Sequence, residues 1–148
     1  MIETNSEKTH TEVKNNEVYK KMLNTIERKA SYTNIMFAAN VRKINDVDHK
    51  KKGVFLFNYF SAKNTEQNLK VWEYTAGWFQ KETGLNNSTL LLPVGERNFQ
   101  YSIINHCRWD SYIHILPALI FKKTFKKYVL DNFYINNVGA QPILYTIL

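Results

Sequence analysis

The chain has 148 residues, 20 Lys and Arg against 13 Asp and Glu, a net charge of +7, and 44% hydrophobic residues. This length suits one domain, or a small domain with an arm, and the single cysteine, Cys107, excludes an intrachain disulfide and a Cys-rich metal site. The polar start is unlike a secretory signal, and no apolar run reaches the roughly 20 residues that span a bilayer. We therefore expect a cytoplasmic protein that has no membrane partner.

Residues 1–52 are expected to form a polar N-terminal arm, because they carry +4 of the net charge and only three aromatic residues. The first fourteen residues have little to bury and should be loosely held. The segment 16–30 repeats apolar side chains every four residues and predicts one amphipathic helix. The repeating residues are Val18, Met22 and Ile26. Residues 32–41 are apolar without a clean period.

The segment 53–148 is expected to form the folded domain. Residues 54–60 (VFLFNYF) are almost continuously apolar, which predicts a strand covered on both faces. A helix should follow, capped by Asn64 or Thr65 and stopped by Gly84.

The second half of this domain repeats the pattern. Residues 88–93 and 99–109 predict a hairpin with its turn at 94–98. Asp110 or Ser111 can cap a helix that runs to about Asn132 with a break at Pro117, and a strand over 142–148 closes the domain.

The element order β-α-β-β-α-β predicts a ferredoxin-like α+β fold, in which two helices cover one face of a four-stranded antiparallel sheet. The opposite face should be solvated in a monomer, yet Phe55, Phe57 and Tyr59 would project from it. Burial of a large apolar side chain contributes roughly 1.5–3 kcal/mol, so such a bare sheet should associate. We therefore expect a homodimer that forms through the sheet face.

Three features accompany this strand order: Asn58 in the first strand, Trp109 two residues before Ser111, and a Phe-rich second helix with Phe121 and Phe125. Together they resemble the dimeric α+β barrel superfamily, and within it the antibiotic-biosynthesis-monooxygenase (ABM) type. The resemblance covers about residues 53–148. Strand order and fold alone do not select an activity within such a superfamily.

The resemblance implies a small oxygenase, mostly without flavin or metal, that acts on polycyclic phenols, quinols or haem. In haem-degrading members an Asn, a Trp and a His form the working set. Asn58 and Trp109 match the first two roles, but residues 121–133 contain no His. We therefore expect no cofactor and no metal site, with haem a disfavoured substrate or ligand.

Strand alternation places Asn58 on one face of its strand, and Asn105 on the same face of the third strand as Trp109. If these faces look toward the helices, two amides and an indole N–H lie in an apolar hollow. A ligand could satisfy them, or the two amides could bond each other or a buried water. His114 is the preferred base, because His106 lies on the opposite face from Trp109.

Asn58, Trp109 and His114 are thus the predicted catalytic residues of a monooxygenase-like protein for an aromatic or polycyclic substrate. The side chains expected to bind that substrate are Phe60, Trp72, Phe79, Asn105, Phe121 and Phe125. The alternative is a ligand-binding or regulatory module without chemistry. A third reading takes the four lysines of residues 122–127 as an anion-binding face, although the same pattern fits an ordinary solvated helix and we do not expect nucleic-acid binding.

Overall fold

The computed structural model describes residues 1–33, 35–95 and 100–147, which divide into two compact units, Met1–Ile35 and Met36–Leu148. The first unit contains two helices, α1 (Glu7–Asn15) and α2 (Glu17–Lys29). The first fourteen residues, expected from the sequence to be disordered or loosely held, include the start of α1, and none of the residues of α1 is buried. The side chain of Ser6 accepts a hydrogen bond from the backbone N–H of Thr9 at 3.1 Å and caps that helix.

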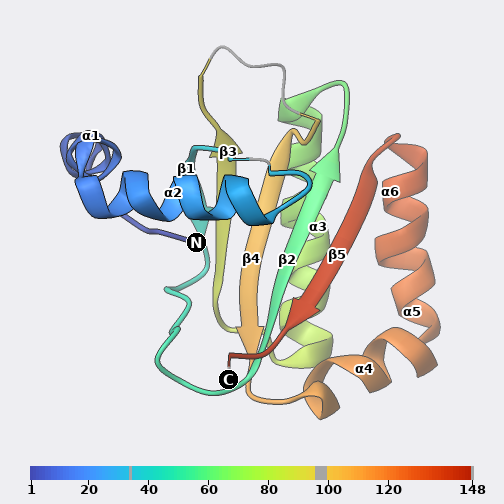
Figure 1. The fold of residues 1–148 in the computed structure, drawn as a ribbon. Helices are drawn as coiled ribbons and strands as arrows, with labels where there is room; N and C mark the ends of the chain where they lie inside the picture. The colour runs from blue at the N-terminus through green and yellow to red at the C-terminus, as the bar shows by residue number, and fades with distance from the viewer. Residues whose placement is uncertain (34, 96–99, 148) are drawn as a thin grey trace. The chain divides into compact units, whose positions relative to one another are not determined.

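The second unit is built on a five-stranded sheet with the strand order β1-β3-β4-β2-β5, all neighbours antiparallel (Figure 1). The strands are β1 (Ala38–Lys43), β2 (Val54–Ser61), β3 (Ser88–Pro93), β4 (Ile103–Trp109) and β5 (Gly139–Tyr145). The last four strands have the order expected of a ferredoxin-like fold, which confirms that prediction. The predicted turn at 94–98 falls largely on residues 96–99, outside the described residues.

The fifth strand, β1, corrects the prediction of four strands. It pairs with β3 from Ala38 opposite Pro93 to Lys43 opposite Thr89, with an irregularity between Asn40 and Arg42. Five of its six residues are exposed. Because an exposed edge strand needs no alternation of apolar and polar side chains, hydropathy gave no signal for it.

Helix α3 (Thr65–Thr83) has the predicted ends. The side chain of Asn64 accepts from the N–H of Gln67 at 3.0 Å, and Gly84 has φ 68°, the left-handed conformation that ends helices and favours glycine. Both predicted boundaries follow from local backbone chemistry.

The second helical segment is interrupted, but at a different residue from the one predicted. Helix α4 (Tyr112–Phe121) passes through Pro117, and the chain turns extended at Lys122. The segment continues as α5 (Lys123–Phe125), a π-helical turn η1 (Lys126–Leu130) and α6 (Asp131–Ile135). Proline removes only the hydrogen bond to the carbonyl of Ile113, which lies on the exposed side of α4 where water can replace it.

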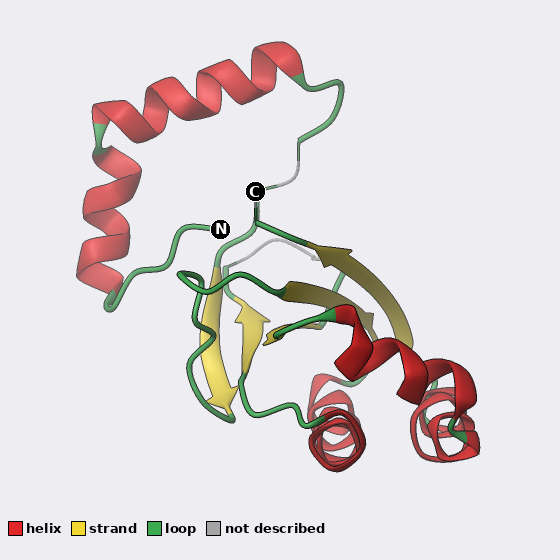
Figure 2. Cartoon of the chain, turned by 90° about the horizontal axis from the view of Figure 1, so that it is seen from below, coloured by secondary structure: helices red, strands yellow, loops and turns green. Residues whose placement is uncertain are grey.

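The helices α3 to α6 lie on one face of the sheet, which gives the second unit two layers (Figures 1 and 2). Between the layers lie the buried side chains of the core, among them Phe60, Trp72, Leu90 and Cys107. The opposite face carries aromatic rings, with Phe57 stacked on His106 at 4.2 Å between centroids and close to Tyr145 at 5.7 Å. No helix in the described part of the chain is long and apolar enough to cross a bilayer.

Candidate active site

A small cavity of about 20 Å³ lies between the sheet and α3, which we call the inner hollow. Alternate residues of β2 and β4, and Ser88 of β3, point into it from the sheet, and α3 and α6 close it from the other side. Its lining residues are Leu56, Asn58, Phe60, Trp72, Thr75, Ala76, Phe79, Leu85, Ser88, Asn105, Cys107 and Phe133. A cavity of this volume has room for about one water molecule. A polycyclic substrate therefore requires the wall of the inner hollow to move.

Asn105 is the centre of a buried polar network in the inner hollow. Its Oδ1 accepts the indole N–H of Trp72 at 3.0 Å and the hydroxyl of Ser88 at 2.5 Å. Its amide nitrogen donates to the sulfur of Cys107 at 3.6 Å. Because each of these contacts joins protein groups, Asn105 holds α3, β3 and β4 together, and its acceptor oxygen is already occupied.

Asn58 lies directly opposite Asn105 across the β2–β4 ladder, but its side chain is not in this network. Its Oδ1 is buried and has no hydrogen-bond partner in the described part of the chain. An unsatisfied buried polar group costs about 1–3 kcal/mol, so such an atom calls for a donor. The hydrogen bond between the two amides, one of the alternatives left open by the sequence, is not formed. Asn58 is thus the group of the inner hollow that is ready to bind a ligand or a water.

Trp109 is buried at the end of β4 and contacts the core rather than the inner hollow. Its indole N–H donates to the hydroxyl of Thr83 at 2.9 Å, and Thr83 in turn donates to the carbonyl of Phe79 at 2.5 Å. The indole packs in the cluster that contains Leu56 and Ile115. Trp109 therefore fixes the C-terminal end of α3. The indole that the sequence analysis expected beside the amides is present, but it belongs to Trp72.

The two candidate bases lie away from the inner hollow. His114 is exposed in the first turn of α4, with Nδ1 3.2 Å from the hydroxyl of Ser111. His106 is buried on the opposite face of the sheet, where its Nδ1 lies 3.0 Å from the carbonyl of Leu56 and its Nε2 lies 2.8 Å from Nε2 of His49. Burial, and next the charge of His49, lower the pKa of His106 to about 4. The role of His114 as a base stays a prediction.

The predicted substrate-binding residues divide into two groups. Phe60, Trp72, Phe79 and Asn105 line the inner hollow. Phe121 and Phe125 lie instead in the helical segment beyond α3, where Phe121 is 77% exposed and Phe125 packs on Trp78 at 5.4 Å.

Sequence reasoning did not single out Thr75, Leu85, Ser88 or Phe133 as lining residues. Two of them carried a readable signal, because Ser88 shares strand parity with Leu90, and Thr75 follows Trp72 by three residues on the same side of a helix. The pair of His49 and His106 was also missed, since His49 lies in a polar connector without a pattern.

The inner hollow can bind and orient a ligand, but its own residues do not remove a proton. Among the described residues, those that line it include no His, Asp, Glu or Lys. Burial raises the pKa of the Cys107 thiol, which therefore stays protonated. No three His, Cys, Asp or Glu side chains of the described ranges are grouped so that they could hold a metal ion. A reaction here would begin from a substrate that is already an anion.

Comparison with protein-family models finds no match, and a search of curated proteins by sequence finds no relative. Three solved structures are similar in fold. SnoaB, a cofactor-independent oxygenase from Streptomyces nogalater, is 20% identical with a TM-score of 0.52, over 66% of this chain and 94% of SnoaB. LmHde, a heme-degrading enzyme from Listeria monocytogenes, is 15% identical with a TM-score of 0.53, over 89% of this chain and 94% of LmHde.

The third is an uncharacterized ferredoxin fold protein related to antibiotic biosynthesis monooxygenases, also from Listeria monocytogenes. It is 17% identical with a TM-score of 0.50, over 81% of this chain and 69% of that protein. At these identities the likeness concerns the fold. The chain therefore has a ferredoxin-like α+β fold, which it shares with these three proteins.

Proposed function

We propose that this protein is a monooxygenase that oxidises an aromatic or polycyclic small molecule in the inner hollow, without flavin or metal. The observation that carries the proposal is the buried Oδ1 of Asn58, a polar atom to which the described residues offer no partner, in a mainly apolar cavity of a monooxygenase-type fold. The fold alone would not justify it, because one fold serves many activities.

In this proposal the substrate is a phenol or an anthrone-like compound that loses a proton easily. The anion enters the inner hollow, where Nδ2 of Asn58 donates a hydrogen bond to the anionic oxygen and Oδ1 of Asn58 accepts one from a hydroxyl elsewhere on the ligand. Phe60, Trp72 and Phe79 supply the apolar walls. Dioxygen then reacts with the electron-rich carbon. In the anion this carbon carries one hydrogen. One oxygen atom forms the new carbonyl, and the other leaves as hydroxide with that hydrogen and takes a proton from solvent to become water. Oriented dipoles in a site without bulk water contribute most to such a reaction.

The wall that must move is the interrupted helical segment. Phe79 and Phe133 close the inner hollow from the side of the helices. The segment that holds Phe133 includes the extended residue Lys122 and the π-helical turn η1, and such interruptions weaken the hydrogen-bond ladder of a helix. Trp109, through Thr83, holds the end of α3 in place while this neighbour shifts. Trp109 is thus proposed to act as a positioning residue.

We also propose that two copies associate through the sheet face opposite the helices. That face presents the half-buried rings of Phe57 and Tyr59 and the 48%-exposed Ile143. Phe55, also expected to project from this face, is instead fully buried and stacks with His49. Exposed apolar side chains on a contiguous surface favour association. The inner hollow lies on the other side of the sheet, so association would leave its helical wall free to move.

Oxygen consumption with a panel of anthrones and quinols tests the function. We expect uptake with at least one compound, with one oxygen atom from dioxygen in the product. Asn58→Ala should lower this rate by about 10²-fold, the effect typical of a lost oriented donor, whereas Asn40→Ala on the exposed strand β1 should leave it unchanged. An equal rate in Asn58→Ala would refute the assigned mechanism. The alternative, a binding module, predicts a ligand that raises the Tm and is recovered unaltered.

A further inference from the structure

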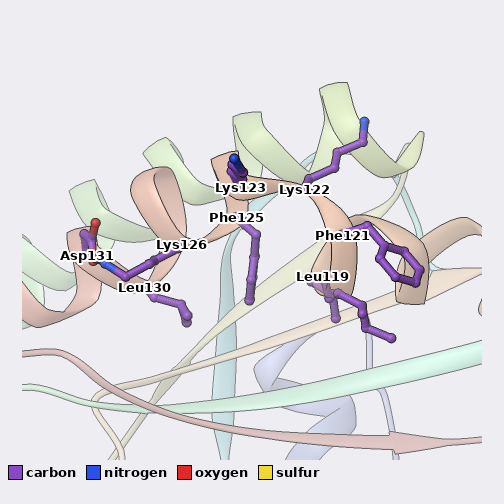
Figure 3. Close-up of a pocket in the computed structure, with 9 residues that line it drawn as sticks. Leu119, Phe121, Lys122, Lys123, Phe125, Lys126, Leu130 and Asp131 are labelled. Carbon is purple, nitrogen blue, oxygen red and sulfur yellow. Dashed lines mark hydrogen bonds and ion pairs between the residues drawn. The ribbon is translucent and has the colours of Figure 1, made fainter.

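A second and larger cavity lies at the bend where α4 passes into α5 and η1 (Figure 3). We call it the outer groove, and its volume is about 370 Å³. It is lined by Leu119, Ile120, Phe121, Lys122, Lys123, Phe125, Lys126, Leu130 and Asp131. Pockets for small ligands commonly measure about 300–1,000 Å³. The outer groove therefore has room for a ligand in this conformation, and the inner hollow does not.

The outer groove is amphipathic. Leu119, Phe125 and Leu130 point to one side of the bend (Figure 3). Phe121 stands at one end of the groove and is 77% exposed, which is a large apolar surface for water to cover. A flat apolar molecule laid against these side chains would remove that surface from water.

The charged rim of the outer groove carries a positive excess. Lys126 is paired with Asp131 at 2.8 Å, and Lys122 with Glu82. Lys123 is exposed and has no carboxylate within ion-pair distance among the described residues. The amino groups of Lys122 and Lys123 lie on the other side of the bend from Phe125 (Figure 3). A ligand with an apolar body and a negative end matches this arrangement, because a long lysine side chain can swing to meet the charge.

The outer groove and the inner hollow share an aromatic wall. Phe125 lines the outer groove and contacts Phe79 edge to face, with 6.5 Å between ring centroids. Phe79 lines the inner hollow. Leu119 also lines the outer groove and packs beside Phe79 in the core. A molecule held in the outer groove is therefore separated from the inner hollow by two contacting rings, Phe125 and Phe79.

We propose that the outer groove binds the anionic form of a small planar aromatic compound, a phenolate or an enolate. The described residues that line the inner hollow include no base, so the anion has to be formed and selected before it enters. A lysine beside an acidic hydroxyl stabilises its deprotonated form and lowers its pKa. The identity of this ligand with the substrate rests on the proposed function, whereas binding in the outer groove does not.

A matched pair of fluorescent probes tests the site on the full-length protein. Anilinonaphthalene sulfonate carries the anionic end, and phenylnaphthylamine has the same rings without it. The sulfonate should bind one site per chain, and Lys123→Glu should weaken it about three- to tenfold while changing the neutral probe by less than about twofold. Lys127→Glu is the control, because Lys127 adjoins this bend but lies outside the lining of the groove.

The apolar side has its own control. Phe121→Ser should weaken both probes about threefold or more, whereas Ile113→Ser, which changes an 80%-exposed residue of α4 outside the groove, should not. Equal affinities in Lys123→Glu, Lys127→Glu and the unchanged protein would overturn the proposal. Loss of binding in Asn58→Leu alone would also overturn it, because the probe would then occupy the inner hollow. Binding in the outer groove without oxygen uptake would instead refute only the proposed function.

Discussion

Replacing Asn58 with leucine should make the protein more stable while it removes the proposed function. Leucine has the same branching as asparagine but carries no polar atom, so Asn58→Leu removes the buried oxygen that lacks a partner. An unsatisfied buried polar group costs about 1–3 kcal/mol. The two methyl groups of leucine are bulkier than the amide oxygen and nitrogen, and the cavity of about 20 Å³ beside this residue can take part of that volume. The remaining overpacking offsets part of the gain in stability. We expect the free energy of unfolding to rise by about 1 kcal/mol, and the Tm by roughly 2–4 °C.

The residue directly opposite supplies a matched control with the opposite sign. Asn105→Leu is the same substitution on the neighbouring strand, but it leaves the buried N–H of Trp72 and the hydroxyl of Ser88 without their acceptor. We expect the free energy of unfolding to fall by roughly 2–4 kcal/mol, because each buried donor left without an acceptor costs about 1–3 kcal/mol. Urea unfolding followed by tryptophan fluorescence measures both variants. A loss of more than about 1 kcal/mol in Asn58→Leu would show that Asn58 is already satisfied, and the reasoning would fail.

Three further predictions concern other parts of the second unit. Burial lowers the pKa of His106 to about 4, so between about pH 6.5 and 4 the unfolded chain binds a proton that the folded chain excludes. The free energy of unfolding should therefore fall with acidification by up to about 1.4 kcal/mol per pH unit. His106→Phe should remove this slope in urea titrations, and an unchanged slope would contradict the assignment. The buried Cys107 thiol, its pKa raised by desolvation, should react with a thiol reagent only in denaturant, and fast labelling of the native protein would count against it. Phe57→Glu should convert the proposed dimer to a monomer, as measured by sedimentation. Tyr74→Glu, on the exposed side of α3, should leave the dimer intact. A wild-type protein that is monomeric at high concentration would exclude the sheet-face dimer.

The fold was predictable where local chemistry is strong. Asn64 and Gly84 gave the ends of α3, and the apolar run 54–60 gave the central strand. The edge strand β1 was not predictable, because it pairs by backbone hydrogen bonds and buries little. The sequence predicted the helix break at Pro117, five residues before the interruption at Lys122. Pro117 removes only one backbone hydrogen bond, and an exposed carbonyl can bond to water instead, so the helix continues through it.

The candidate site was predictable only as a face of the sheet. Strand parity placed Asn58 and Asn105 together, as the register between β2 and β4 shows. Strand parity could not predict that the amide oxygen of Asn105 accepts a hydrogen bond from Trp72 while that of Asn58 accepts none from the described residues. That difference depends on which side chain of α3 reaches the strand. The contact between His49 and His106 joins residues 57 positions apart and has no sequence pattern.

The account depends on the inner hollow opening to admit an aromatic ring. A crystal structure with a quinone product or a non-reactive quinol analogue tests this most directly. We expect the rings of the ligand between Phe79 and the sheet, with a ligand oxygen or hydroxyl within hydrogen-bond distance of the Asn58 amide, and the segment from Lys122 to Phe133 displaced outward. A ligand seated elsewhere at saturating concentration, over an inner hollow still closed by its own side chains, would contradict the account.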